Sequence, residues 1–347
     1  MSTQEWGTTV VSGHRRAEGR EAVAAVDPGG PDHTLALELV RVTEAAAIAA
    51  GRWAGRGERG SGRLAATGAM RELIMSVPMR GVVVVGEQEA TPALAKGEGV
   101  GYGDGPACDV GIGVGDAALS SARDVPHSLA AIAVAERGAL FDPSAVRSMQ
   151  KLAVGPDCAG VVDIRLPVVE NLRAVATAKD VPVTDVVVGV LNRPWHADLV
   201  HEIRRAGARV HPLEGGDLAG AVAVARPESR VDVVVGTGGA AEGVLAAAAL
   251  SCLGGSLQVR LRPEGAGRGD RGEVLHTGDL VRGGSVLFCA TGVTGSELLT
   301  GVEHRPGRIA TQSIVLCSRP RSVRMVRSER ADTGWREQRA EPTRASS

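Results

Sequence analysis

Aromatic residues are scarce in this sequence, which has two Phe, one Tyr and four Trp among 347 residues. Proteins that bind single-stranded nucleic acid stack the bases on aromatic side chains, and this composition offers few such platforms. The sequence also lacks an excess of charge of either sign, since 39 Lys and Arg residues face 40 Asp and Glu residues. Such a balance gives no general attraction to nucleic acid or to an anionic membrane. We therefore expect a small-molecule or protein partner, no nucleic acid and no membrane.

Cysteines are few, and long apolar runs are absent. The five cysteines are odd in number, and none belongs to a Cys-x-x-Cys pair. This pattern is typical of reduced thiols in a cytosol and argues against a disulfide framework or a zinc site. No apolar run approaches the roughly 20 residues that span a bilayer, and the N-terminus lacks the basic and apolar segments of a signal peptide. We expect a cytoplasmic protein.

The composition that remains, 44% hydrophobic and 23% charged, is typical of a globular protein with one large core or two moderate ones. Composition predicts a flexible N-terminal extension over residues 1–33 and a flexible tail over 328–347. Between them we expect an N-terminal subdomain over 34–166 and a C-terminal α/β subdomain over 167–327.

Hydrophobic periodicity predicts an α/β fold. Apolar residues recur at spacings of three and four from Leu35 to Trp53, which indicates a helix, and Val82 to Val85 form a buried strand. After Pro167 helices and strands alternate in the rhythm of βαβ units on a largely parallel sheet. The predicted helices there are 168–178, 195–206, 217–225 and 240–252, and the predicted strands are 185–191, 209–213 and 231–236. Further strands are expected near 108–114, 129–136, 150–154, 256–261, 285–291, 311–317 and 322–327.

The segment VVVVGEQEATPAL places Glu87 and Glu89 just beyond a hydrophobic strand. Side chains two residues apart point the same way if the strand continues. Two convergent carboxylates suit a hard cation such as Mg²⁺ or Mn²⁺, which prefers oxygen ligands. On spacing alone, however, a solvated strand end is the more common explanation.

The segment VVVGTGGAAEGVLAAAAL reads as a strand, a glycine-rich turn and the start of a helix. The backbone N–H groups around Gly238 and Gly239 could hold a phosphate at the helix N-terminus. Glu242, in the first helical turn, is either a charge that satisfies the helix dipole or a metal ligand. The glycines resemble a dinucleotide fingerprint only superficially, because the acidic residue expected on the following strand is absent.

Several stretches, in order from about Leu35 to Arg327, resemble the class II fructose-1,6-bisphosphatases. They are LALELVRVTEAAAIAAGRWAGRG, AMRELIMSVPMRGVVVVGEQE, SLAAIAVAERGALFDPSAV, KLAVGPD, RPWHADLVHEIRRAGARV, GTGGAAEGVLAAAAL and VLFCATGVTGSELLTGV. The resemblance implies the fold of the lithium-sensitive sugar and inositol phosphatases, a layered α/β/α/β/α sandwich with mixed sheets. It also implies hydrolysis of the 1-phosphate of fructose 1,6-bisphosphate in gluconeogenesis, dependence on Mn²⁺ or Mg²⁺, and a homo-oligomer, either a dimer or a tetramer.

The resemblance assigns metal ligands to Glu87, Asp116 and Glu242, and catalytic roles to Glu89 and Asp116. The family's signature Asp-Pro-x-Asp/Glu-Gly-Thr falls on residues 113–118, where its first Asp is Gly113 and its Thr is Ala118. Another ligand Asp of the family is Arg63 here. These changes make the site more positive by three charges, which opposes a second divalent ion by several kcal/mol at an effective dielectric of about 20. We expect Arg63 to point into the carboxylate cluster and partly replace a metal ion.

Substrate contacts are carried over in part. The substrate-binding positions that match the family are Arg193, His196, Asp217, Gly238 and Gly239. Three others are changed, since a Tyr, a basic residue and an Asp of the family are Ser148, Trp195 and Gly215 in this sequence. A histidine such as His196 is more often a structural hydrogen-bonding residue than a catalyst.

Three hypotheses remain open at the level of sequence. The first is an active, slow fructose-1,6-bisphosphatase that uses one metal ion. The second is a catalytically inactive paralogue that binds sugar phosphate or regulates an active relative. The third is a nucleotide-dependent oxidoreductase, which bound NAD(P)H would reveal.

Overall fold

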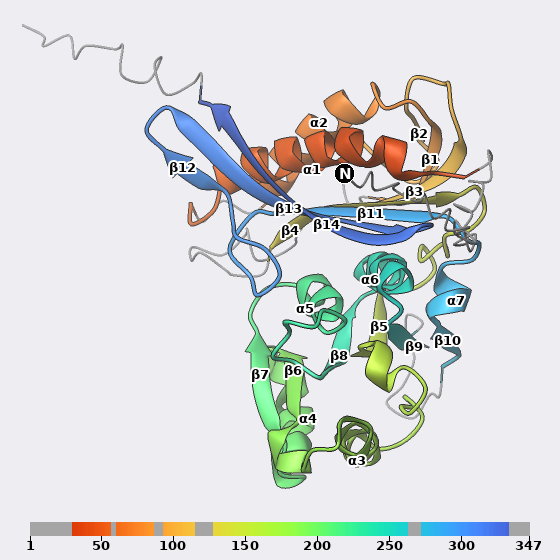
Figure 1. Cartoon of the computed structure of the whole chain (residues 1–347), viewed down its shortest axis with the longest axis vertical. Coiled ribbons are helices and arrows are strands. Elements are labelled where there is room, and N and C mark those ends of the chain that lie inside the picture. The colour runs from red at the N-terminus through yellow and green to blue at the C-terminus, as the bar shows by residue number, and fades with distance from the viewer. Residues whose placement is uncertain (1–29, 57–59, 87–92, 115–127, 263–271, 333–347) are drawn as a thin grey trace, which may run out of the picture.

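The computed structural model describes residues 30–56, 60–86, 93–114, 128–262 and 272–332. Figure 1 shows five layers, in which helices and sheets alternate from one end of the molecule to the other. The α/β/α/β/α sandwich expected from the sequence is confirmed. The helices are α1 (Ala36–Gly51), α2 (Ser61–Ile74), α3 (Val168–Lys179), α4 (Ala197–Arg205), α5 (Asp217–Ala223), α6 (Ala240–Leu253) and α7 (Thr277–Leu280).

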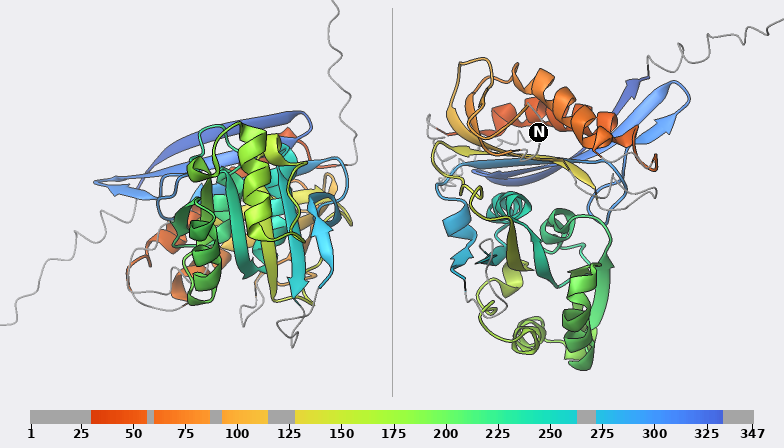
Figure 2. Two further views of the ribbon diagram at one scale, coloured as in Figure 1. Left: turned by 90° about the horizontal axis from the view of Figure 1, so that it is seen from below. Right: turned by 180° about the vertical axis from the view of Figure 1, so that it is seen from behind.

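The first sheet has eight strands, and α1 and α2 cover its outer face (Figures 1 and 2). Its strand order is β12-β13-β11-β4-β3-β1-β2, and β14 pairs with β13 along the other side of that strand. Among the described strands of this sheet, β1 and β3 are the one pair that runs parallel. The strands are β1 (Arg80–Val85), β2 (Gly99–Val100), β3 (Ala107–Val114), β4 (Leu129–Glu136), β11 (Val286–Gly292), β12 (Glu303–Arg305), β13 (Arg308–Ser318) and β14 (Arg321–Ala331).

The second sheet has six strands in the order β10-β9-β5-β8-β6-β7, and α3 and α4 lie on its outer face. Strand β6 runs parallel to β7 and β8, whereas β5 is antiparallel to both β8 and β9. The parallel arrangement expected for the βαβ units after Pro167 is confirmed for β6, β7 and β8. The sheet as a whole is mixed, because β5, β9 and β10 join it in antiparallel pairs, whose direction periodicity does not report. These strands are β5 (Ser148–Val154), β6 (Val187–Leu191), β7 (Arg209–Leu213), β8 (Val233–Gly239), β9 (Ser256–Arg262) and β10 (Val274–His276).

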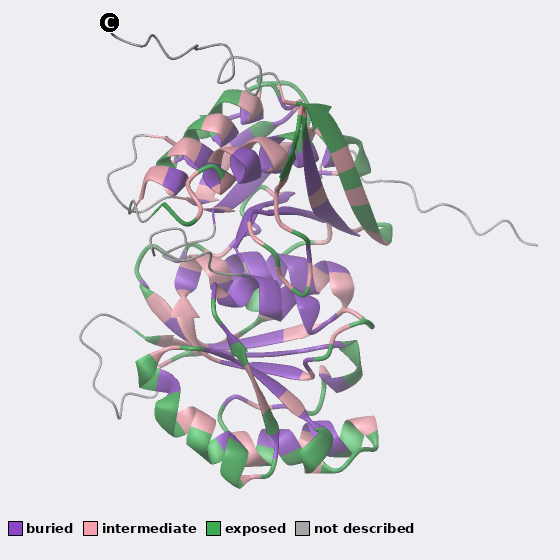
Figure 3. Cartoon of the chain, turned by 90° about the vertical axis from the view of Figure 1, so that its left-hand side faces the viewer, coloured by how far each residue is buried: buried purple, intermediate pink, exposed green. Residues whose placement is uncertain are grey.

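The middle layer consists of α5 and α6, which lie between the two sheets (Figure 1). Helix α6 has the sequence AAEGVLAAAALSCL, and most of its residues are buried. A helix that is apolar on all sides is stable only when it is surrounded by protein, and its alanines let both sheets approach closely. Figure 3 shows this layer as mostly buried, while the outer helices expose one face.

The two sheets do not correspond to the two subdomains that were expected on either side of residue 167. Strand β5 precedes that point but belongs to the second sheet, and from β11 onward the chain returns to the first sheet. Residues at both expected flexible ends also take part in the fold. The backbone oxygen of Pro31 accepts a hydrogen bond from Ser285 Oγ at 2.5 Å, and β14 continues to Ala331, which pairs with Arg308. No helix among the described residues is long and apolar enough to cross a membrane.

Candidate functional site

The glycine turn that joins β8 to α6 forms one wall of the candidate site. Gly239 is the N-cap of α6, so the first N–H groups of the helix open toward this turn. Two carboxylates pack closely against these glycines. A Cβ at Gly238 would lie 2.2 Å from Asp217 Oδ2, and a Cβ at Gly239 would lie 2.0 Å from Glu242 Oε2. The glycines therefore allow two acidic side chains to approach the backbone.

His196, the last residue of the short helix η5 (Pro194–His196), is buried and contacts the backbone of this turn. Its Nε2 accepts a hydrogen bond from the backbone N–H of Thr237 at 2.8 Å. An N–H group can only donate, so the ring proton is on Nδ1, which donates to the carbonyl oxygen of Leu191 at 2.9 Å. Both ring nitrogens are engaged by the backbone, which makes His196 a structural hydrogen-bonding residue.

Asp217 begins α5 and is 7% exposed. Its Oδ2 lies 2.6 Å from Nζ of Lys151 on β5, and both side chains are buried. Lys151 was not predicted as a site residue, although the stretch KLAVGPD contains it. A buried carboxylate needs a positive partner, and Lys151 provides that partner directly beside the glycine turn.

Arg193 organises the loop that precedes α5. Its guanidinium group donates to the carbonyl oxygens of Asn192 at 3.0 Å, Glu214 at 3.1 Å and Gly215 at 3.1 Å. Three backbone contacts hold Arg193 on the loop before Asp217.

A cavity of about 140 Å³ lies on the other side of the turn, where α2, β3, α6 and the segment before β5 meet. Arg63, which we expected to point into the site, lines this cavity together with Glu242. Arg147 lines it too and was not predicted, since it precedes a strand without any motif of its own. The backbone carbonyl of Arg147 accepts a hydrogen bond from Ala240 N–H at 3.2 Å, which ties this residue to the start of α6.

Gly113, which the sequence resemblance aligned with an aspartate, is packed against α6. A Cβ at this position would lie 2.5 Å from Cδ1 of Leu245, a buried residue that also lines the cavity. The space that a side chain at position 113 requires is thus taken by a leucine methyl group.

The described residues do not fit a pair of divalent ions. Among the described residues that line the cavity, the charged ones are Glu242, Arg63 and Arg147. Nowhere in the described part of the chain do three or more His, Cys, Asp or Glu side chains gather closely enough to hold a metal ion. Two unit positive charges about 4 Å apart repel each other by about 4 kcal/mol at an effective dielectric of about 20, and a divalent ion doubles that energy. The other expected acidic residues, Glu87, Glu89 and Asp116, lie outside the described residues, as does Ala118.

The cysteines do not supply a nucleophile. All five are free and buried. Burial raises the pKa of the Cys108 thiol to about 11 and that of Cys252 to about 12. At neutral pH these thiols are protonated, and a protonated thiol is a poor nucleophile.

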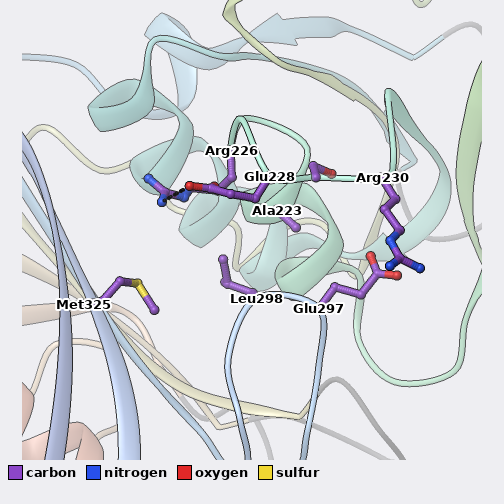
Figure 4. Close-up of a pocket in the computed structure, with 8 residues that line it drawn as sticks. Ala223, Arg226, Glu228, Arg230, Glu297, Leu298 and Met325 are labelled. Atoms are coloured by element: carbon purple, nitrogen blue, oxygen red, sulfur yellow. Dashed lines mark hydrogen bonds and ion pairs between the residues drawn. The ribbon is translucent and has the colours of Figure 1, made fainter.

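Another cavity, of about 490 Å³, lies between the loop after α5 and the segment before β12 (Figure 4). Its charged side chains largely compensate one another. Arg226 pairs with Glu228 at 3.2 Å, and Glu297 lies 2.9 Å from Nε2 of His211. Figure 4 also shows Arg230 and Glu297 pointing toward one another. This cavity contains none of the residues expected to carry the chemistry.

Comparison with known proteins gives consistent matches. The family model described as "Bacterial fructose-1,6-bisphosphatase, glpX-encoded" matches residues 33–330. The fructose-1,6-bisphosphatase 1 class 2 of Escherichia coli (strain K12) is 34% identical over 317 residues, which cover 85% of this chain and 94% of that protein. The class 2 fructose-1,6-bisphosphatases of Escherichia coli O6:H1 and Shigella flexneri match with the same identity and the same coverage.

Proposed function

The chain belongs to the family of bacterial class II fructose-1,6-bisphosphatases, and we propose that it hydrolyses the 1-phosphate of fructose 1,6-bisphosphate, a step of gluconeogenesis. The products are fructose 6-phosphate and phosphate. The observation that carries the proposal is the extent of the family match, which spans residues 33–330. That range includes every element around the glycine turn and the cavity beside Glu242.

The proposed substrate contacts are centred on the glycine turn. We propose that a phosphate binds where Gly238 and Gly239 lead into α6, because it would benefit there from the positive end of the helix dipole. Asp217 is proposed to contact the sugar. Its ion pair with Lys151 holds it beside Gly238. Arg193 and His196 support this arrangement by fixing the loop before Asp217 and the backbone of Thr237.

The family is metal-dependent, and we propose Mn²⁺ or Mg²⁺ as the cation, one per site, with Glu87, Asp116 and Glu242 as ligands. A divalent cation in such a site supplies polarisation of a phosphoryl oxygen and activation of the attacking water. Glu89 and Asp116 are the proposed catalytic carboxylates that accept the proton from that water. A pair of cations is not part of the proposal, because Arg63 and Arg147 occupy the same cavity as Glu242.

The proposal is tested by following the products. Purified full-length protein is incubated with fructose 1,6-bisphosphate and either Mn²⁺ or Mg²⁺, and ³¹P NMR reports the phosphorus species. We expect fructose 6-phosphate and phosphate in equal amounts. The matched control is Glu242→Gln, which preserves shape and removes the charge, and should release at least about a hundredfold less phosphate. Equal phosphate release by the wild type and Glu242→Gln would rule out this site.

The remaining features of the proposal concern assembly and location. We expect a homo-oligomer, a dimer or a tetramer, which mass photometry of the purified protein resolves directly. We place the protein in the cytoplasm, and its five free, buried cysteines are consistent with a reducing compartment.

A further inference from the structure

We propose that Arg63 and Arg147 hold the phosphoryl group of the substrate in the cavity beside Glu242 and take the place of a second divalent cation. This inference rests on the proposed function, because it assigns a phosphate ester to the same site. It concerns how the anion is bound, however, and it can be tested in the absence of any metal ion.

The cavity brings the two arginines together from distant parts of the sequence. Arg63 comes from the first turn of α2, and Arg147 comes from the segment that leads into β5. The backbone of Arg147 is fixed by the hydrogen bond from Ala240 N–H at 3.2 Å, so its side chain starts at the N-terminus of α6. Arg63 and Arg147 thus line the same cavity as Gly239 of the proposed phosphate turn.

The position of Arg63 is not explained by helix stability. Gly60 is the N-cap of α2, no residue of its first turn is acidic, and Arg63 is the third residue of the helix. A positive charge at a helix N-terminus opposes the helix dipole, which favours negative charge there. A phosphate bound in the cavity would offset this unfavourable placement.

The chemistry of the lining suits a phosphate. Arginine presents a planar set of donors that bind phosphate oxygens in pairs, and its charge persists at every physiological pH. Among the described lining residues, two arginines face one carboxylate, Glu242. A cavity needs only about 10–15 Å³ to hold one water molecule, so about 140 Å³ leaves room for a phosphoryl group with water around it.

Position 113 lines the cavity but carries no side chain that could bind a metal ion. The space at Gly113 is occupied by Leu245, whose Cδ1 would lie 2.5 Å from an added Cβ. Positive charge near the phosphoryl group is therefore supplied by fixed side chains. The competing explanation is that the two arginines only neutralise acidic side chains, and in that case their removal leaves phosphate binding unchanged.

Calorimetric titration of the full-length protein with orthophosphate and with fructose 1,6-bisphosphate, both in EDTA, tests the proposal. We expect binding without a divalent ion, and a loss of at least about tenfold in affinity in Arg63→Gln and in Arg147→Gln. The matched control is Arg173→Gln, which changes an exposed arginine on α3 that pairs with Glu170 at 2.8 Å. The affinity of this variant for both phosphate ligands should equal that of the wild type. Thermal melts identify any variant that fails to fold, and Arg147→Lys then serves as a milder variant, which keeps the charge and loses the paired donors.

A second measurement uses the metal alone. Titration with Mn²⁺ followed by electron paramagnetic resonance should show tighter binding in Arg63→Asp than in the wild type, by at least about tenfold, because a repulsive charge becomes a ligand. Unchanged phosphate affinity in both Gln variants, or no binding in EDTA, would overturn the inference. If phosphate binds in the expected arginine-dependent way but fructose 1,6-bisphosphate is not hydrolysed, the proposed function fails and the inference stands.

Discussion

Asp217 and Glu242 are carboxylates on neighbouring helices that approach the same glycine turn, but they lie in different surroundings. Asp217 is buried and paired with Lys151 at 2.6 Å, whereas Glu242 lines the cavity that Arg63 and Arg147 also line. Asp217 is therefore held in a fixed position beside the turn, from which it is proposed to contact the sugar, whereas Glu242 is placed to meet a ligand in the cavity.

The Lys151–Asp217 pair predicts strong coupling in a double-mutant cycle. Lys151→Met leaves a buried carboxylate without its partner and should lower the free energy of unfolding by about 3–5 kcal/mol. Asp217→Asn removes the charge that Lys151 neutralises. The double variant should therefore lose less free energy of unfolding than the two single variants lose together. Urea denaturation measures this free energy for the wild type, the two single variants and the double variant. Additive losses within about 0.5 kcal/mol would show that the two residues do not interact.

Gly238 predicts a local steric effect. In Gly238→Ala the new Cβ would lie 2.2 Å from Asp217 Oδ2, so either the turn or the carboxylate must move. We expect a loss of about 1–3 kcal/mol in the free energy of unfolding and weaker binding of fructose 1,6-bisphosphate. Gly160→Ala is the matched control, because no atom lies within 4 Å of the place that its new methyl group would take. Similar stability of the two variants would contradict the close approach.

At the scale of elements, periodicity predicted most helices and strands but not their partners. The helices expected at 217–225 and 240–252 are α5 and α6, displaced by one or two residues at their C-terminal ends. Strands β2, β10 and β12 have only two or three residues, too few to show a pattern. Strand β14 was predicted too short because its arginine-rich end looks polar, yet it pairs with β13 along its whole length.

Helix α2 offers a test of local helix preference. Gly68 lies in the interior of this helix on its exposed side, and no atom lies within 4 Å of where its Cβ would be. Gly68→Ala should raise the free energy of unfolding by about 0.5–1 kcal/mol, because alanine loses less backbone entropy on folding. A thermal melt of the two proteins measures this change. A lower melting temperature in Gly68→Ala would mean that the site is not open as described.

At the scale of the whole molecule, the buried thiols link stability to pH. Burial raises the pKa of Cys252 from an ordinary value of 9.0 to about 12. Between these two values the unfolded chain loses a proton that the folded chain keeps, so rising pH favours the unfolded state. The free energy of unfolding should therefore fall above about pH 9, by up to about 1.4 kcal/mol per pH unit for this thiol.

Urea denaturation at pH 8, 9 and 10 measures this dependence in the wild type and in Cys252→Ala. Other groups titrate in the same range and affect both proteins. The contribution of Cys252 is therefore the difference between the two proteins in the slope of the free energy of unfolding against pH. This slope should be shallower in the variant. Identical slopes would show that the thiol has the same pKa in the folded and unfolded chains.

The site as a whole could be predicted only where sequence carries a pattern. The glycine turn and Glu242 stand at a strand-to-helix junction that the sequence reveals, and Arg63 was singled out because the resemblance aligns it with an aspartate. Lys151 and Arg147 could not be found this way, since each depends on which strand pairs with β8 and which backbone meets the start of α6. Long-range pairing of this kind leaves no local signal.

The most direct test of the account is the turnover of fructose 1,6-bisphosphate, measured side by side with the fructose-1,6-bisphosphatase 1 class 2 of Escherichia coli, which is 34% identical. Both proteins are assayed for phosphate release with Mn²⁺ and with Mg²⁺. We predict measurable turnover that is at least about a hundredfold lower in this protein, because a single lost contact to the transition state has an effect of that size. A turnover number equal to that of the Escherichia coli enzyme would contradict the account.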